Sequence, residues 1–231
     1  MRLLKHSVAL VFTLVLAACG GNSECCSSGK VTSFPNAILT NEVPRLVVGQ
    51  SDSNYHEFSE LHFTFTSENY FKENPTGHAA LLMRTLGSQI TTKLEGVGMV
   101  FGNVSLASNT IPGNPATEPN RLFPSVQIET WFHGHDTQNF LLAPINPAII
   151  LEDNVSYDMV VKSHIKEDKS IQTEQILIYK MGDLIWDSGV VTDPNKYIIS
   201  TYNDIAVGHV FEEPNAKPWK IIFSNISLIQ N

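Results

Sequence analysis

The chain has 231 residues, of which 15 are basic and 23 acidic, and its net charge is −8 at neutral pH. This acidic balance argues against nucleic acid as a partner and against electrostatic docking on anionic lipid, because both need a basic surface. All three cysteines lie within the first 26 residues. The rest of the chain contains no disulfide and must be stabilised by a hydrophobic core, which about 190 residues are enough to build.

The first eighteen residues have the three parts of a secretory signal. Arg2 and Lys5 supply positive charge, an almost entirely apolar run from Ser7 to Leu16 follows, and the small pair Ala17-Ala18 ends it. The apolar run is shorter than the roughly 20 residues that cross a bilayer as a helix. We therefore expect a signal peptide over residues 1–18 and no membrane span. Its removal leaves 13 basic and 23 acidic residues, a net charge of −10.

The end of this signal, Leu16-Ala17-Ala18-Cys19, resembles the lipobox of bacterial lipoproteins. The resemblance implies that Cys19 becomes the first residue of the mature protein and carries acyl chains such as palmitate. At about 0.8 kcal/mol per buried CH₂, several such chains would hold the protein on a lipid membrane. Gly20 follows in place of Asp, which by the sorting rule of enterobacterial lipoproteins implies the outer membrane. The alternative is an ordinary secretory signal followed by a chance cysteine.

A polar segment follows Cys19. Gly20 to Ser33 consists of Gly, Ser, Asn, Cys and Lys with almost no apolar residue, a composition typical of a flexible tether. Cys25 and Cys26 lie in it as neighbours, and we expect them to be tail thiols without a structural role. The sequence predicts a tether over residues 19–34 and a single domain over residues 35–231. The nearest approach to an internal linker, Asn103 to Pro124, is interpreted as a long loop.

The periodicity of the domain is two, not 3.6. Leu61, Phe63 and Phe65 alternate with polar residues, and similar alternation recurs over 97–102, 126–133 and 157–162. Apolar segments on either side of Met181-Gly182-Asp183 predict a hairpin with glycine where a positive φ is needed. Further short apolar segments follow at 198–199, 205–210 and 219–229. This pattern predicts an all-β fold, a sandwich of two antiparallel sheets, with Trp186 and Trp219 in its core.

The second half of the chain resembles the concanavalin A-like lectin/glucanase superfamily. The resemblance is carried by the hairpin of the form "apolar, Gly, apolar, Trp-Asp-Ser-Gly", which ends at Gly189, and by the last strand, Trp219-Lys-Ile-Ile-Phe-Ser-Asn-Ile. It covers about Leu61 to Ile229 as a pattern rather than a strict motif. It implies a jelly-roll sandwich in which one sheet is concave and sugar binds in its groove. Fold does not fix function.

The segment Ser125 to His133 is the candidate groove strand. Gln127, Glu129, Trp131 and His133 recur at a spacing of two and would share one face, while Val126 and Ile128 enter the core. An indole stacks on the apolar face of a sugar ring, and an amide, a carboxylate and an imidazole bind hydroxyl groups. The alternative is an ordinary outer sheet surface that shows polar residues to water.

Catalysis needs more than this row supplies. Glycosidases generally use a pair of carboxyl groups, and the glucanases of the superfamily place Glu, Asp and Glu at alternating positions, whereas here Gln127 and Trp131 flank Glu129. Alginate-lyase-like enzymes of similar shape carry an Arg on one strand and a Gln-Ile-His element on another. Arg84 would share the face of His78 and could act with Gln127, His133 and a Tyr. Glu129 and the net charge of −10 would both repel an anionic uronate.

Metal and cofactor signals are weak. His133-Gly134-His135-Asp136 contains His and Asp residues that can ligate a metal, but a third ligand is not recognisable, and Asn203-Asp204 has no calcium loop around it. Gly96-x-Gly98 lies in strand-like sequence with no helix after it, which argues against a dinucleotide site and favours either close approach of a neighbouring chain segment or a bend in the strand. We therefore expect no cofactor and no metal.

These observations favour a lipoprotein of the bacterial envelope whose sandwich binds a glycan without catalysis. The expected ligand-binding residues are Gln127, Glu129, Trp131, His133 and Arg84, with Cys19 as the lipidated residue. The expected partners are a glycan and a lipid membrane, not nucleic acid. Two alternatives stay open: a polysaccharide-degrading enzyme, either a glycoside hydrolase or a lyase, and a structural envelope protein whose sandwich has no groove.

Overall fold

The computed structural model describes nine segments of the chain: residues 29–49, 54–74, 78–85, 96–105, 122–131, 139–143, 149–193, 204–210 and 217–231. Almost all of these residues belong to strands, and the single described helix, α1 (Tyr70–Glu73), has four residues. Within these segments no helix is long and apolar enough to span a membrane. The signal, Cys19 and His133 lie outside the described residues.

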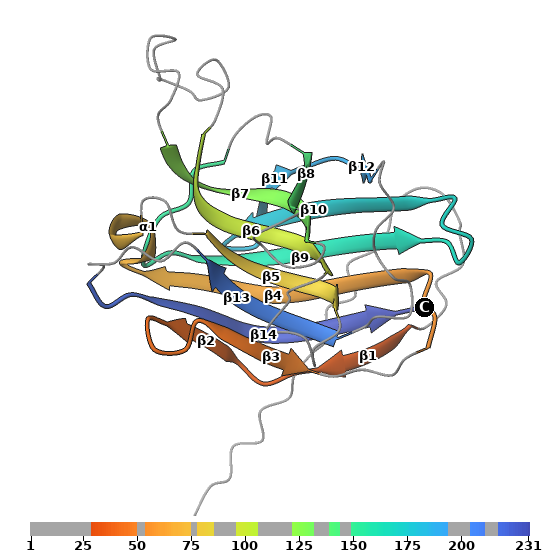
Figure 1. Cartoon of the computed structure of the whole chain (residues 1–231), viewed down its shortest axis with the longest axis horizontal. Coiled ribbons are helices and arrows are strands. Elements are labelled where there is room, and N and C mark those ends of the chain that lie inside the picture. The colour runs from red at the N-terminus through yellow and green to blue at the C-terminus, as the bar shows by residue number, and fades with distance from the viewer. Residues whose placement is uncertain are drawn as a thin grey trace, which may run out of the picture.

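The described strands form two antiparallel sheets that pack face to face as layers (Figure 1). Sheet A has the order β1 (Lys30–Ser33), β14 (Lys220–Gln230), β4 (Phe58–Glu68), β9 (Ser156–Ile165), β10 (Gln172–Lys180) and β11 (Asp183–Asp187), with β2 (Ala37–Thr40) beside β14 and β12 (Val191–Thr192) beside β10. Sheet B has the order β3 (Arg45–Gly49), β13 (Asp204–Val210), β5 (His78–Thr85), β6 (Gly96–Ser105), β7 (Leu122–Trp131) and β8 (Asn139–Ala143). The chain crosses repeatedly from one sheet to the other, which confirms the predicted jelly-roll sandwich.

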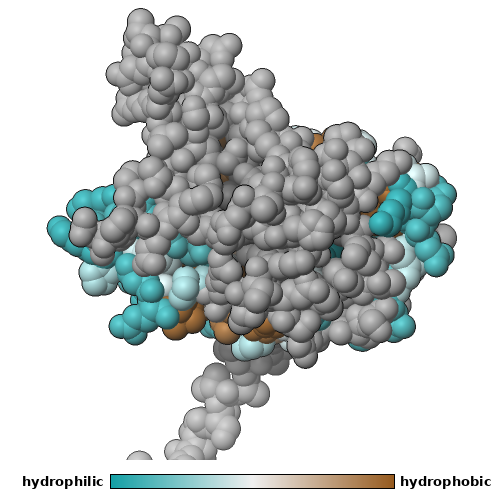
Figure 2. All heavy atoms as spheres, in the orientation of Figure 1, coloured by the Kyte–Doolittle hydropathy of each residue, from teal (hydrophilic) through white to brown (hydrophobic). Residues whose placement is uncertain are grey.

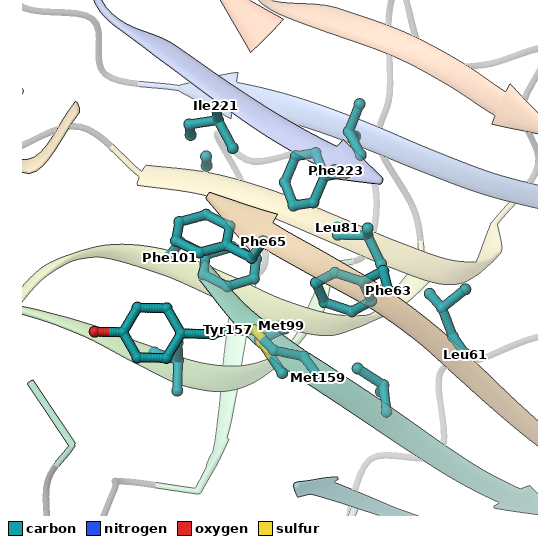
Figure 3. Close-up of a cluster of buried hydrophobic side chains, with 14 of the residues drawn as sticks. Leu61, Phe63, Phe65, Leu81, Met99, Phe101, Tyr157, Met159, Ile221 and Phe223 are labelled. Carbon is teal, nitrogen blue, oxygen red and sulfur yellow. The ribbon is translucent and has the colours of Figure 1, made fainter. Parts of the chain in front are cut away.

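Alternation along each strand builds the core between the sheets. In β4 the odd-numbered residues from Ser59 to Ser67 are buried and the even-numbered ones are partly exposed. Phe65 of sheet A stacks on Phe101 of sheet B, with ring centroids 4.3 Å apart and planes 3° from parallel, and Phe223 of β14 packs against both (Figure 3). Burying each such side chain contributes roughly 1.5–3 kcal/mol. Trp186 and Trp219 are also buried, as predicted.

The predicted hairpin is present and its turn is tighter than the sequence indicated. Between β10 and β11 the turn residues Met181 and Gly182 have φ angles of 56° and 89°. Positive φ at both central residues is the type I′ pattern that matches the twist of paired strands. Met181 is 94% exposed, so the turn holds its strained backbone without packing its side chain.

Three strands extend beyond the boundaries that the sequence predicted. β1 lies inside the predicted tether, where its residues Lys30 to Ser33 pair with Gln230 to Ser227 of β14. Backbone pairing at a sheet edge needs no apolar pattern, and Val31 is 62% exposed. The sandwich therefore starts before the predicted boundary at residue 35. β6 and β7 likewise extend into both ends of the loop predicted from Asn103 to Pro124.

The described surface is polar at its ends. In the view of Figure 2 hydrophilic residues gather at both ends of the long axis, and smaller hydrophobic areas lie between them. The hairpin between β9 and β10 forms the right-hand end in Figure 1. In this view the described surface is thus most hydrophilic at the two ends of the sandwich.

Candidate functional site

The predicted ligand row lies on β7, between β6 and β8 in sheet B. Val126 of β7 is completely buried in the core, as predicted. Gln127, Glu129 and Trp131 occupy positions that alternate with Val126, and positions two apart along a strand lie on one face of the sheet. The three positions therefore belong to the face of sheet B opposite the core. The predicted fourth member, His133, lies beyond the described end of β7.

Glycines of β6 lie beside two of these positions. The register pairs Glu129 with Gly98 and Trp131 with Gly96. A Cβ atom on Gly98 would collide with the carbonyl oxygen of Leu81 in β5, and one on Gly96 would lie 2.8 Å from the carbonyl oxygen of Met83. The prediction that a neighbouring strand passes close to these glycines is confirmed. As a result, β6 presents no side chain beside Glu129 or Trp131.

The outer face of sheet B is not open along its whole width. Ala80 and Leu82 of β5 and Ala206 of β13 are completely buried, yet they do not belong to the core cluster between the sheets. Their neighbours Ala79 and Leu81 do belong to that cluster, so alternation places the first set on the outer face. Chain therefore covers the outer face over β5 and β13. Gly96 and Gly98 of β6 are buried as well. Any groove on this face is therefore limited to β7 and β8.

Arg84 lies in a different place from the one predicted. Between Leu82 and Thr85 the strand β5 has two residues where its partner β13 has one, a β-bulge, and Arg84 has a φ of 52°. The bulge interrupts the alternation that would have placed Arg84 on the face of His78. Its side chain is 2% exposed and extends to the opposite sheet, where Nε donates a 2.8 Å hydrogen bond to Ser163 Oγ. The expectation of a shared outer face is wrong.

The guanidinium of Arg84 joins the two sheets at one end of the sandwich. It also donates hydrogen bonds to the carbonyl oxygens of His56, at 2.9 Å, and Glu57, at 3.1 Å. Ser163 Oγ in turn donates to Oε1 of Glu174 at 3.1 Å. We name Arg84, Ser163 and Glu174 the polar clamp. All three residues are buried, so this arrangement serves to hold the sheets together and offers no surface to a ligand.

Burial dominates the electrostatics of the polar clamp. It lowers the pKa of the Arg84 guanidinium to about 10, although the charge of Glu174 works in the opposite direction. Burial raises the pKa of the Glu174 carboxyl well above its usual value, and Arg84 and the bond from Ser163 offset part of that rise. Each group is thus pushed toward its neutral form by desolvation and toward its charged form by its partner.

The described residues hold no cluster of three or more His, Cys, Asp or Glu side chains that could bind a metal ion. The sequence His133 to Asp136 lies outside them, as does Asn203.

A pocket of about 600 Å³ that the sequence analysis missed lies where β2, β4 and β14 meet. The ion pair between Lys220 and Glu68, at 2.8 Å, forms part of its wall. Trp219 contributes from a buried position, where it packs edge-on against Tyr70 and its backbone N–H donates to Asn41 Oδ1. Three distant segments build this pocket, and only strand pairing brings them together, so no local pattern could have indicated it.

Comparisons with known proteins give similarity of fold alone. No protein-family profile matches the chain, and no curated protein matches it. Among solved structures, the alginate lyase Aly36B is 12% identical, with a TM-score of 0.45 over 84% of this chain and 80% of that chain. The basic winged bean lectin is 14% identical, with a TM-score of 0.42 over 87% and 92%. The lectin UEA-II is 8% identical, with a TM-score of 0.46 over 87% and 98%.

Proposed function

We propose that this protein binds a glycan without catalysis, on the outer face of sheet B around β7, and that acyl chains on Cys19 hold it on a bacterial envelope membrane. The observation that carries the binding proposal is the register of β6 and β7. Glu129 and Trp131 lie beside Gly98 and Gly96, where the neighbouring strand has no side chain. No side chain of β6 therefore lies beside Glu129 or Trp131, and the two glycines are themselves buried, so the proposed site is the row on β7.

The residue types of the row match the chemistry of a sugar. A pyranose ring has apolar C–H faces, on which an indole can stack, and hydroxyl groups that both donate and accept hydrogen bonds. Trp131 supplies the indole, Glu129 a carboxylate acceptor and Gln127 an amide that can donate and accept. At about 3.4 Å per residue, Gln127 and Trp131 are about 14 Å apart along the strand, which makes room for an extended ligand.

Two features favour binding over degradation. Hydrolysis of a glycosidic bond generally uses two carboxyl groups, and Glu129 is the single acid among the alternating positions from Gln127 to Trp131. A lyase would use a cation to neutralise a uronate, and the side chain of Arg84 is committed to the polar clamp. The net charge of −10 after loss of the signal also opposes a polyanionic substrate. We therefore propose a neutral glycan as the ligand class.

A glycan array tests the binding proposal. The full chain is purified in a detergent without a sugar headgroup and compared with Trp131→Ala, with Glu129→Ala and with a matched surface control, Met181→Ala. We expect binding to neutral glycans that Trp131→Ala abolishes and that survives in the Glu129→Ala and Met181→Ala proteins. New reducing ends or unsaturated uronates released from a bound glycan would show an enzyme instead. The absence of any bound glycan would favour a structural protein.

The anchoring proposal has its own test. Cells that express the chain are grown with radioactive palmitate and then fractionated. We expect label on the protein and its recovery in the outer membrane fraction, and we expect both to be lost in Cys19→Ala. A Cys25→Ala/Cys26→Ala variant is the matched control and should keep both. A label that Cys19→Ala retains would contradict the assignment of the lipid to this residue.

A further inference from the structure

The outer face of sheet A carries a hollow of about 270 Å³ on the opposite side of the sandwich from β7. It lies across β4, β9 and β10, close to the end of the sandwich that contains the polar clamp. Small-molecule sites typically have volumes of about 300–1,000 Å³, so this hollow suits a ligand of about one ring.

The strand register explains why the hollow exists. Ser59, Ser163 and Glu174 are neighbours in one row across the three strands, and all three are buried. Because their side chains point into the sandwich, this row contributes only backbone to the outer face. Outward-pointing side chains of the two flanking rows then stand on either side of a bare strip. The hollow thus lies over the same inward row that contains Ser163 and Glu174 of the polar clamp.

One flanking row is aromatic. Phe58 of β4 lies opposite His164 of β9, and the two rings stack with centroids 4.2 Å apart and an interplanar angle of 21°. Nε2 of His164 is hydrogen-bonded to Glu57 at 2.9 Å, which fixes the orientation of the imidazole. Phe58 is still 47% exposed, and Val190, 69% exposed, adds a second apolar group to the lining. Large apolar groups held open to solvent beside a hollow favour a ligand with an apolar face.

The other flanking row is polar and balanced in charge. Glu60 accepts from His62 at 3.3 Å and pairs with Lys162 at 3.4 Å. The bond from His62, together with the charge of Lys162, lowers the pKa of Glu60, so the carboxylate stays ionised. Next in the row is Gln175, whose Nε2 donates to Asp187 at 2.8 Å. The row therefore contains donors and acceptors within one hollow and no net excess of the positive charge that an anionic ligand would need.

We propose that this hollow is a second ligand site, which takes a single neutral sugar ring with one face against Phe58 and its hydroxyl groups toward Glu60, Lys162 and Gln175. Hydroxyl groups both donate and accept, which matches a row that offers both. The proposal goes beyond the site on β7 and does not depend on it. Two sites on opposite faces would let one protein bridge two glycan chains or two parts of one chain.

Nuclear magnetic resonance of the ¹⁵N-labelled full chain, in a detergent without a sugar headgroup, tests this site. The probes are glucose, galactose, mannose and N-acetylglucosamine, with glucuronic acid and glucosamine as charged comparators. We expect at least one neutral probe to move the amide signals of Lys162, Thr173 and Gln175, and to do so at lower concentration than either charged comparator. Phe58→Ala and Gln175→Ala should each weaken this binding by at least about tenfold, the equivalent of 1.4 kcal/mol.

Two control variants separate this site from the one on β7. Ile185→Ala removes a large apolar side chain of similar exposure, 44%, from β11 of the same sheet, and it should leave binding unchanged. Trp131→Ala should abolish binding on β7 and leave the response of Gln175 intact. The proposal is overturned if no neutral probe moves these signals, if a charged comparator binds more tightly, or if Gln175→Ala binds as well as the parent chain. Gln175 is a surface residue, so its variant keeps the test valid should Phe58→Ala fail to fold.

Discussion

The centre and the end of the sandwich hold the two sheets together by different means. At the centre, Phe65 of sheet A stacks on Phe101 of sheet B with no polar atom between them (Figure 3). At the end, Arg84 reaches across from sheet B to Ser163 and to backbone carbonyl groups. Apolar contact is insensitive to pH and tolerates small shifts in position. A buried guanidinium needs its hydrogen-bond partners to be present, because an unpaired charge in the interior is costly.

The difference also shapes the surface above each region. The hollow of sheet A lies over the inward row formed by Ser59, Ser163 and Glu174. The inward-pointing aromatic residues of the centre alternate with residues such as Thr64 and Thr66, whose hydroxyl groups bond to Asp158 and Ser156 across the strands. The end of the sandwich is thus the part whose outer face carries the hollow.

The largest expected effect comes from breaking the polar clamp. Arg84→Met should lower the free energy of unfolding by about 3–5 kcal/mol, because Ser163 Oγ and two carbonyl groups lose their donor and Glu174 loses the nearby positive charge. Urea unfolding followed by circular dichroism measures the change. The double variant Arg84→Met/Glu174→Leu should recover most of the loss, since it removes both charges. A double variant that is no more stable than Arg84→Met would show that the two residues are not energetically coupled.

Truncation at the centre gives the matching measurement. Phe65→Ala should cost about 3–4 kcal/mol, from lost burial and the cavity that remains. Unlike the loss at the polar clamp, this loss should be the same at pH 5 and pH 8, because the ring partners of Phe65 in the described segments, Phe71, Phe101 and Phe223, do not titrate. A loss that changes by more than about 1 kcal/mol between these pH values would contradict the proposed contrast, given the usual size of such effects.

Titration of Glu174 sharpens the comparison further. The unfolded carboxyl loses its proton near pH 4.5, whereas burial raises the pKa of the folded one. The folded chain therefore binds the proton more tightly, and the free energy of unfolding should fall as pH rises above 4.5, by at most about 1.4 kcal/mol per pH unit. The free energy of unfolding stops falling once the pH exceeds the pKa of the Glu174 carboxyl in the folded chain. Urea midpoints measured from pH 4 to pH 8 should show it in the parent chain and not in Glu174→Gln. The same dependence of stability on pH in the parent chain and in Glu174→Gln would refute this role of Glu174.

The smallest expected effect lies outside both regions, in the turn between β10 and β11. Met181 adopts a φ of 56° with its side chain in solvent. Asparagine accepts this conformation more readily and precedes glycine in many such turns. Met181→Asn should raise the free energy of unfolding by about 0.5–1 kcal/mol, measured in the same urea experiment. Because no packing is lost, a variant less stable than the parent chain would contradict the view that the positive φ at Met181 is unfavourable.

What the sequence predicts depends on whether alternation holds. Along β4 it does, and the inward Leu61, Phe63 and Phe65 could be read directly from the period of two. At Arg84 one extra residue in β5 reverses the side chain, and a single sequence carries no sign of that bulge. The hollow on sheet A is assembled from three strands whose register is not local information. β1 is held by backbone pairing with β14, so no pattern of side chains predicts it.

The position of β1 has a mechanical consequence. Lys30 opens this edge strand and pairs with Gln230 at the far end of β14, the strand that also pairs with β4. With an anchor at Cys19, any pull on a captured ligand would reach the membrane through Lys30 and the ladder between β1 and β14. β1 would then be the first strand to peel away under load, while the remaining strands of sheet A stayed paired. The segment between the membrane and sheet A would then lengthen while the ligand stayed bound.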